Sequence, residues 1–123
     1  MYFGSFSVLL WISKEFYRLI RTKQRYLDFI KKGQKTLEVR VGYEHIKTIQ
    51  PGESVKFCSR VEALITIVKA IRKYSTIEEM LEYEEAGRII PNLSKSEVLK
   101  ILREIYPVDL EKLGIIVLEI EKK

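Results

Sequence analysis

Apolar and charged residues alternate along the stretch that follows Gly33. Because successive side chains of a β-strand point to opposite faces, the pattern predicts a strand over 36–42 with one face in a core. Glu38 and Arg40 then share the other face, which is either a solvated surface or the wall of a binding site. The apolar residues of the core face are Leu37, Val39 and Val41.

Four further segments have the composition of strands. We expect the first at 15–22, one at 54–59 after a Pro-Gly turn, and the last at 114–121. Segment 63–74 is apolar at both odd and even positions over most of its length, so both faces of a strand there would be apolar. A strand with two apolar faces belongs in a closed barrel or in a sheet that is covered on both sides.

Three helices are predicted between these strands, at 23–32, 76–84 and 95–106. The first has apolar residues at helical spacing and ends at Gly33. The other two follow capping boxes, in which a serine N-cap precedes a glutamate by three residues. These boxes are Ser75 with Glu78 and Ser94 with Glu97, and 86–93 is expected to be a loop between the two helices. The chain therefore reads as an α+β domain, a highly curved sheet of five or six strands with about three helices packed on it.

The first 15 residues differ from the rest, because they are almost wholly apolar and uncharged up to Lys14. The stretch is too short to span a bilayer and lacks the basic segment and cleavage site of a secretory signal. We therefore expect residues 1–15 to be an extension, packed or disordered, of a domain at 16–123. No membrane association is expected.

The single cysteine, Cys58, excludes an internal disulfide and favours a reducing, cytoplasmic location.

Charge is unevenly distributed along the 123 residues, although the net charge is only +5. Residues 14–35 hold 8 Lys or Arg and 2 Asp or Glu, whereas residues 61–123 hold 10 and 12. A basic region of that density can attract a polyanion such as RNA. The alternative is an ordinary solvated Lys/Arg-rich surface.

Four motifs, in order along the chain, resemble those of the ASCH domain, a member of the PUA-like superfamily. They are FIKKGQKTLEVRV, IQPGESVKF, KYSTIEEML and LGIIVLEIE. The first contains the pattern Gly-x-Lys-x-x-Glu-x-Arg, and the resemblance extends from about residue 16 to 121. One departure is Glu53-Ser54, where the family often has Asp followed by an apolar residue.

The resemblance implies a small PUA-like β-barrel with a cleft lined by Lys35, Glu38 and Arg40, which would bind RNA or a nucleotide. Lys35 should lie in the turn after Gly33, free to reach the cleft. An Arg fork suits phosphate or a base edge, a Lys supplies a point charge, and a Glu accepts from an exocyclic amine. If the face is instead solvated, Glu38 and Arg40 form a surface pair that contributes under about 1 kcal/mol.

Further residues are candidates for contacting such a ligand. Tyr43 and Tyr74 could stack on a base, with Ser75 beside them, or could simply pack in the protein. The RNA backbone would follow the basic helix, where the candidate contacts are Arg25, Lys31 and Lys32.

A hydrolase is the first alternative function. One ASCH branch deacetylates acetylated cytidine with a lysine, a threonine three residues later and a distant glutamate. Only the lysine has a counterpart here, Lys35. Glu38 stands at the position of the threonine, and Pro91 stands at the position of the glutamate. Other ASCH proteins are ribonucleases, so Lys35 and Glu38 are the candidate catalytic residues.

No cofactor or metal is expected. His45 is the only histidine and has no ligand spacing with Cys58, and no phosphate-binding glycine pattern occurs.

A last alternative is a protein-interaction module. Its contact face would be one helical stripe of acidic residues, which otherwise is a solvated face: Glu78, Glu82 and Glu85.

Overall fold

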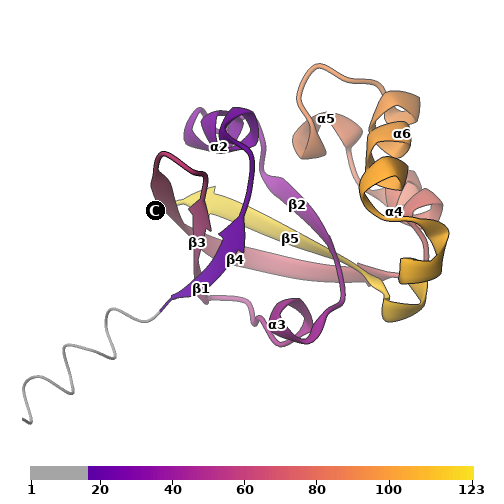
Figure 1. The fold of residues 1–123 in the computed structure, drawn as a ribbon, viewed down its shortest axis with the longest axis horizontal. Helices are drawn as coiled ribbons and strands as arrows, with labels where there is room; N and C mark the ends of the chain where they lie inside the picture. Colours follow the sequence, from indigo (N-terminus) through magenta and orange to yellow (C-terminus); the bar gives the residue numbers. More distant parts are fainter. Residues whose placement is uncertain (1–16) are drawn as a thin grey trace, which may run out of the picture.

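The computed structural model describes residues 17–123, and its centre is one curled sheet of five strands in the order β1-β3-β4-β5-β2 (Figure 1). The apolar extension expected at 1–15, and the start of the strand expected from residue 15, lie outside the described residues. The strands are β1 (Arg18–Arg21), β2 (Leu37–Val41), β3 (Ser54–Cys58), β4 (Ala63–Tyr74) and β5 (Ile115–Lys122).

The helices pack on the two faces of this sheet (Figure 1). Those expected from the sequence are α2 (Gln24–Lys31), α4 (Ile77–Tyr83) and α6 (Lys95–Ile105). Three shorter ones are added: α3 (Glu44–Lys47), α5 (Ala86–Ile89) and the 3₁₀ helix η1 (Val108–Leu113). The α+β class and the curled, barrel-like sheet expected from the sequence are thus confirmed. Within residues 17–123, no helix is long and apolar enough to cross a membrane.

The sheet forms half a barrel, and its two ends are β1 and β2. β1 pairs with β3 in parallel, and every other neighbouring pair is antiparallel. The register between β4 and β5 shifts between Val68 and Ala70, which is the irregularity of a β-bulge. A bulge increases local twist and bends its strand, so it helps the sheet to curl.

Two apolar cores explain why β5 is buried on both faces, whereas β4 is mostly half-buried and Val68 is its one buried apolar residue. One lies under α4 and α6 and contains Leu37, Val39, Val41, Ile77, Met80, Val98, Leu102, Ile115 and Val117. The other fills the curl of the sheet under α2 and α3 and contains Ile20, Leu27, Ile30, Ile46, Val55, Phe57, Val68, Ile116, Leu118 and Ile120. The expected core face of β2 is therefore confirmed, and the face of Glu38 and Arg40 is the one that looks into the curl.

Two local expectations are wrong. The cap of α4 is Thr76, whose side chain accepts from the Glu79 main-chain N–H (3.0 Å), so this helix begins one residue later than its predicted box. Ser-Thr followed by Glu-Glu offers two overlapping boxes, and pattern alone does not choose between them. The loop expected at 86–93 contains α5. The predicted capping box of Ser94 with Glu97 is present.

Candidate functional site

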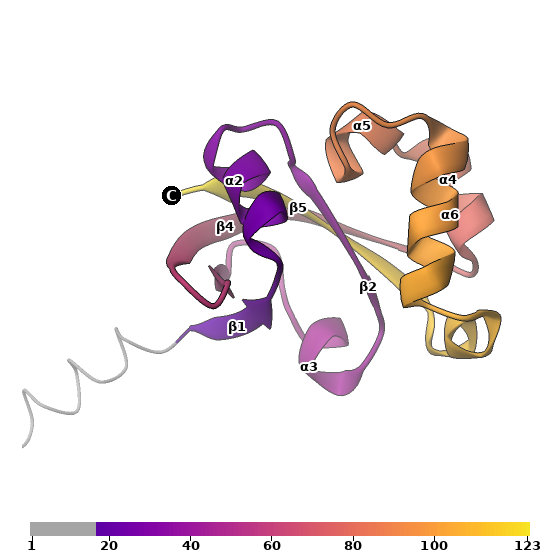
Figure 2. The ribbon, with the colours of Figure 1, turned by 45° about the horizontal axis from the view of Figure 1, so that its top comes forward.

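A pocket of about 230 Å³ lies at the outer edge of β2. β2 passes between α2 on one side and α5 and α6 on the other, as Figure 2 shows. One wall comes from the β1–α2 junction with Tyr26, and the other from Ile89, Ile90 and the end of α6. Lys35, Glu38 and Arg40 all line this pocket, so the structure brings the three motif residues together.

The Lys35 side chain is fixed in place. Its Nζ donates to the carbonyl oxygens of Leu37 (2.8 Å) and Ile89 (2.9 Å) and contacts Glu38 Oε1 at 3.1 Å. An ammonium group has three protons, and here each has an acceptor. Only 5% of the residue is exposed. Lys35 lies in the expected turn, but its side chain is not free: it holds α5 against β2.

Glu38 is buried between two cations. Its carboxylate contacts Lys35 Nζ through Oε1 and accepts from Arg40 Nε (2.5 Å) through Oε2. Burial acts to raise the pKa of this carboxyl, but the charges and hydrogen bonds of Lys35 and Arg40 outweigh it and lower the pKa below its ordinary value. Glu38 is therefore ionised at neutral pH, and a solvated Glu–Arg surface pair is excluded for this face.

Arg40 is the member of the trio that still has donors to offer. Nε contacts Glu38, and Nη2 donates to the Arg21 carbonyl oxygen (2.7 Å). Among residues 17–123, Nη1 has no hydrogen-bond partner, and 24% of the side chain is exposed in the pocket. The guanidinium is thus held in position on one side and open to a ligand on the other.

The rest of the pocket is cationic and aromatic. Arg21 and Lys23 line it from the β1–α2 junction, and Tyr26 and Tyr106 from the two walls. Burial raises the pKa of the Tyr106 phenol, so the hydroxyl remains a donor at neutral pH. Sequence reasoning missed Tyr106 as a site residue. A usable signal was its place before Pro107, because a residue before proline leaves the helix and can turn its side chain away from the helical stripe.

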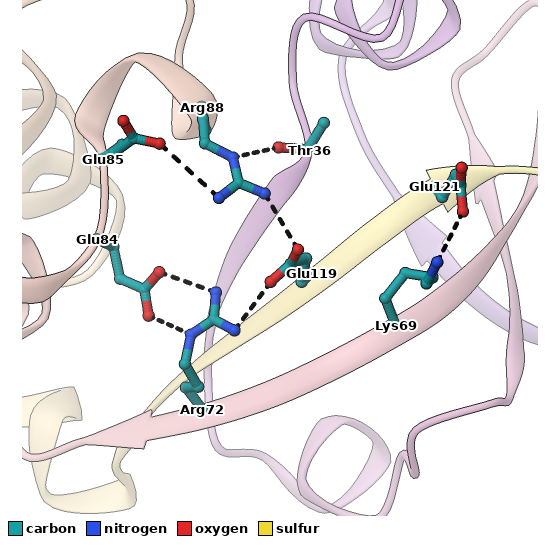
Figure 3. Close-up of polar contacts among 8 residues, drawn as sticks. All are labelled: Thr36, Lys69, Arg72, Glu84, Glu85, Arg88, Glu119 and Glu121. Carbon is teal, nitrogen blue, oxygen red and sulfur yellow. Dashed lines mark hydrogen bonds and ion pairs between the residues drawn. The ribbon is translucent and has the colours of Figure 1, made fainter.

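Charged side chains hold the α5 wall from behind (Figure 3). Arg88 donates to Thr36 Oγ1 (2.7 Å) and to Glu119 (3.2 Å), and its carbonyl oxygen accepts from the Thr36 N–H (3.0 Å). Arg72 joins Glu119 to Glu84, the buried carboxylate that precedes α5. Because α5 has only four residues, these contacts and Lys35 fix where Ile89 and Ile90 stand.

The other candidate ligand contacts lie outside the lining of this pocket. Tyr43 is exposed on the segment after β2 and stacks with His45, with ring centroids 6.2 Å apart. Tyr74 donates to Glu84 and stacks on Tyr83, and burial together with that hydrogen bond raises its pKa to about 12. Ser75 is exposed at the start of α4. Their roles in binding stay predictions.

The candidate backbone contacts lie on α2 and the turn after it. Arg25 stacks over Tyr26, with the guanidinium carbon 5.0 Å from the ring centroid. Lys31 pairs with Glu62 (3.1 Å), and Lys32 is exposed. Both lysines line a second hollow of about 430 Å³. Lys35 and Thr36, in the turn before β2, line it too.

The expected acidic stripe is partly neutralised within the chain. Glu78 pairs with Arg103, and Glu85 lies 3.8 Å from Arg88 Nη1. Glu82 is exposed.

In the described part of the chain, no group of three or more His, Cys, Asp or Glu residues could hold a metal ion.

Comparison with known proteins identifies the family. The chain belongs to the ASCH domain family, whose model matches residues 20–122. It is similar to the crystal structure of hypothetical protein PH0355, with 33% identity, a TM-score of 0.76, and coverage of 85% of this chain and 97% of that one. It is also similar to the solution structure of protein PF0455 from Pyrococcus furiosus, with 31% identity, a TM-score of 0.71, and coverage of 87% and 97%.

A more distant likeness concerns the fold alone. A variant of the ZmASCH protein from Zymomonas mobilis superimposes with a TM-score of 0.60 at 14% identity, over 84% of this chain and 67% of that one. No functionally curated protein matches the chain. Domains of the ASCH family are generally thought to bind RNA.

Proposed function

We propose that this domain binds RNA and takes one nucleotide into the pocket at Lys35, Glu38 and Arg40. The observation that carries the proposal is the charge of the pocket. Four cationic side chains line it, and Glu38 is the only carboxylate among the lining residues of the described chain. Such an excess favours an anionic ligand. The cationic residues are Arg21, Lys23, Lys35 and Arg40.

The shape of the pocket supports a nucleotide in particular. Its volume of about 230 Å³ is below the roughly 300–1,000 Å³ of most small-molecule sites, so it suits one planar group with the rest of the ligand outside. Tyr26 and Tyr106 supply aromatic surface on which a base can stack, an interaction that tolerates any base. Phosphates would remain in solvent near Arg21 and Lys23.

The trio divides the work of recognition. Lys35 positions the site, because all its protons are already bonded within the chain. Arg40 has a free Nη1 for a phosphate oxygen or a base acceptor, and the Glu38 carboxylate is limited to accepting. The lowered pKa of Glu38 makes it a weak base. Its burial between two cations therefore supports a binding role better than acid–base catalysis.

Fluorescence anisotropy with short single-stranded RNA tests this function. We expect wild-type protein to bind at low salt, and Arg40→Gln to weaken binding by about tenfold or more, a loss of about 1.4 kcal/mol. Arg60→Gln is the matched control, because Arg60 is exposed and lies outside the pocket. Absence of binding at micromolar protein and low salt would overturn the proposal, and so would equal losses in the two variants.

A further inference from the structure

The outer edge of β2 has a hydrogen-bonding pattern that can be deduced from its two ends. The Ile120 N–H donates to the Thr36 carbonyl oxygen, and the Gly42 N–H donates to the Gly114 carbonyl oxygen, both at 2.9 Å. In an antiparallel ladder, hydrogen-bonded pairs recur at every second residue. Residues 36, 38, 40 and 42 therefore direct their main-chain groups toward β5, and residues 37, 39 and 41 direct theirs away from the sheet.

Among these three outward residues, Val39 is the one whose N–H and C=O both lack a partner in the described chain. The Leu37 carbonyl oxygen accepts from Lys35 Nζ (2.8 Å), and the Val41 carbonyl oxygen accepts from the Tyr43 N–H (2.8 Å). Within residues 17–123, neither the N–H nor the C=O of Val39 has a partner. The Val39 side chain is buried in the core, yet the residue lines the pocket. Its main-chain groups point away from β5 at this edge, so they are the groups that it can offer to a ligand.

We propose that the pocket takes an unpaired nucleobase edge-on and pairs the Watson–Crick edge of that base with the Val39 main chain. This inference rests on the proposed RNA binding and adds which part of the nucleotide is recognised. Each of the four bases carries a hydrogen-bond acceptor next to a donor on its Watson–Crick edge. The Val39 N–H matches the acceptor and the C=O matches the donor.

The walls of the pocket fit this orientation. A flat ring that meets β2 with its edge has Tyr26 on one side and Ile90 and Tyr106 on the other. Apolar and aromatic walls suit the two faces of a base, and main-chain groups suit its edge. Glu38 and Arg40 lie at the same edge and can add a contact to an exocyclic amine or carbonyl.

A peptide strand is a poorer occupant of the same edge. Strand addition uses main-chain groups at every second residue along an edge. Here the Leu37 and Val41 carbonyl oxygens on both sides of Val39 already have donors. A single residue with both groups open is enough for the edge of a base, whereas a ladder also needs the carbonyl oxygens of Leu37 and Val41. Because the Watson–Crick edge must be free, bases within a duplex are excluded from the site.

Modified RNA tests the inference without altering the protein. Short oligouridine is compared with the same oligomer made of 3-methyluridine, which blocks the Watson–Crick edge, and of 5-methyluridine, which leaves that edge intact. Both modified bases are uncharged. A parallel series uses adenosine, N6,N6-dimethyladenosine and 7-deazaadenosine. In the better-binding series, we expect the blocked oligomer to bind about tenfold more weakly or worse, whereas the intact control stays within about twofold of the unmodified one.

Amide NMR of the ¹⁵N-labelled protein gives a second readout. The Val39 N–H resonance should shift on titration with the unmodified oligomer, and much less with the blocked one. Equal binding of blocked and unmodified RNA, together with an unmoved Val39 amide, would overturn this inference and leave RNA binding intact. A protein that binds none of these oligomers would instead refute the proposed function itself, and the inference with it.

Discussion

Arg40 Nη2 donates a hydrogen bond to the Arg21 carbonyl oxygen at 2.7 Å, and this bond joins the two edge strands of the sheet. Arg40 belongs to β2 and Arg21 to β1, which stand at opposite ends of the strand order. No ladder connects these strands in the described structure. The same guanidinium therefore bridges the open side of the half-barrel and forms part of the pocket, so fold and site share one side chain.

Loss of the Arg40 guanidinium should destabilise the domain. Arg40→Ala leaves the Arg21 carbonyl without its donor and leaves Glu38 with Lys35 as its only cation. We expect the free energy of unfolding to fall by about 1–3 kcal/mol, the usual loss when a buried polar group is left unpaired. Arg40→Lys keeps the positive charge beside Glu38, so it should lose less stability than Arg40→Ala. It should still be less stable than the wild type, because a lysine cannot make both contacts.

Urea denaturation of the two Arg40 variants and of Arg60→Ala measures this effect. Arg60 is exposed, and its replacement should change the free energy of unfolding by less than about 0.5 kcal/mol. If Arg40→Ala is as stable as Arg60→Ala, the bridge between β1 and β2 contributes nothing measurable.

Replacing Glu38 should make the stability of the domain less dependent on pH. Its pKa in the folded protein lies below the ordinary value of 4.5, so the charged form stabilises the fold above pH 4.5 and this contribution is lost as the pH falls through the lowered pKa. Glu38→Gln should be less stable near neutral pH by about 3–5 kcal/mol, because it leaves buried cations without a counter-charge. In acid, wild-type Glu38 is neutral too, so the difference should narrow.

Chemical denaturation of both proteins between neutral and acidic pH tests the sign. Glu84 and Glu119 also have lowered pKa values, each mainly through its hydrogen bond to Arg72, so both proteins will lose stability in acid. The informative quantity is the difference between the two curves. A difference that stays constant or widens toward low pH would contradict the ionised state of Glu38.

Much of the fold follows from the sequence because periodicity records burial. The twelve-residue strand β4 matches the predicted range, and the parity of β2 correctly assigns its core face. The short helices α3, α5 and η1 were missed, because four to six residues carry too little periodicity. Ile105 shows another limit: it stands at helical spacing from the buried Val98 and Leu102, but it is 51% exposed at the edge of the pocket.

The site was predictable only in part. The motif spacing brings Lys35, Glu38 and Arg40 together, but the saturation of Lys35 depends on the Ile89 carbonyl oxygen, 54 residues away. The alternation of residues along β2 assigned Glu38 to the face opposite the core. That assignment fits a solvated Glu–Arg pair as well as it fits a buried site. Its burial depends on a second core formed by α2 and the curl of the sheet. Contacts of that range are set by topology, which local pattern does not contain.

The close approach of η1 to β2 gives a prediction at Gly42. A Cβ built there would overlap the main-chain carbonyl oxygen of Leu113. Gly42→Ala should therefore lower the free energy of unfolding by about 1–3 kcal/mol, because backbone rather than a flexible side chain must move. Gly87→Ala is the control: its Cβ meets nothing within 4 Å, and alanine favours helix by about 0.5–1 kcal/mol. Thermal denaturation should separate the two variants in opposite directions, and similar melting temperatures would contradict the placement of η1.

The N-cap of α4 can be assigned by a pair of substitutions. Thr76→Ala removes the acceptor of the Glu79 N–H and should destabilise the domain by about 1 kcal/mol. Ser75→Ala should have little effect, because Ser75 contributes its main-chain N–H, which donates to Glu79 Oε1 in either protein. Urea denaturation decides the matter, and a larger loss for Ser75→Ala would restore the cap expected from the sequence.

The two lysines at the end of α2 should contribute unequally to RNA binding. Lys31 already pairs with Glu62, and its Nζ lies 3.1 Å from each carboxylate oxygen, whereas Lys32 is exposed and has no ion pair within residues 17–123. A phosphate that contacts Lys31 must compete with Glu62, so Lys32 is the freer cation. If about four phosphates are neutralised, log K should fall with log salt with a slope near −3 for single strands.

Anisotropy titrations at several salt concentrations test this asymmetry. Lys32→Ala should reduce the slope by about 0.7, the contribution of one phosphate on a single strand, for every RNA sequence tested. Lys31→Ala should reduce it less, and Glu62→Gln should strengthen binding because it releases Lys31 from its partner. Lys73→Ala, at an exposed lysine of β4, is the charge-matched control. Equal slopes for Lys32→Ala and Lys73→Ala would show that the RNA backbone does not follow α2 and the turn after it.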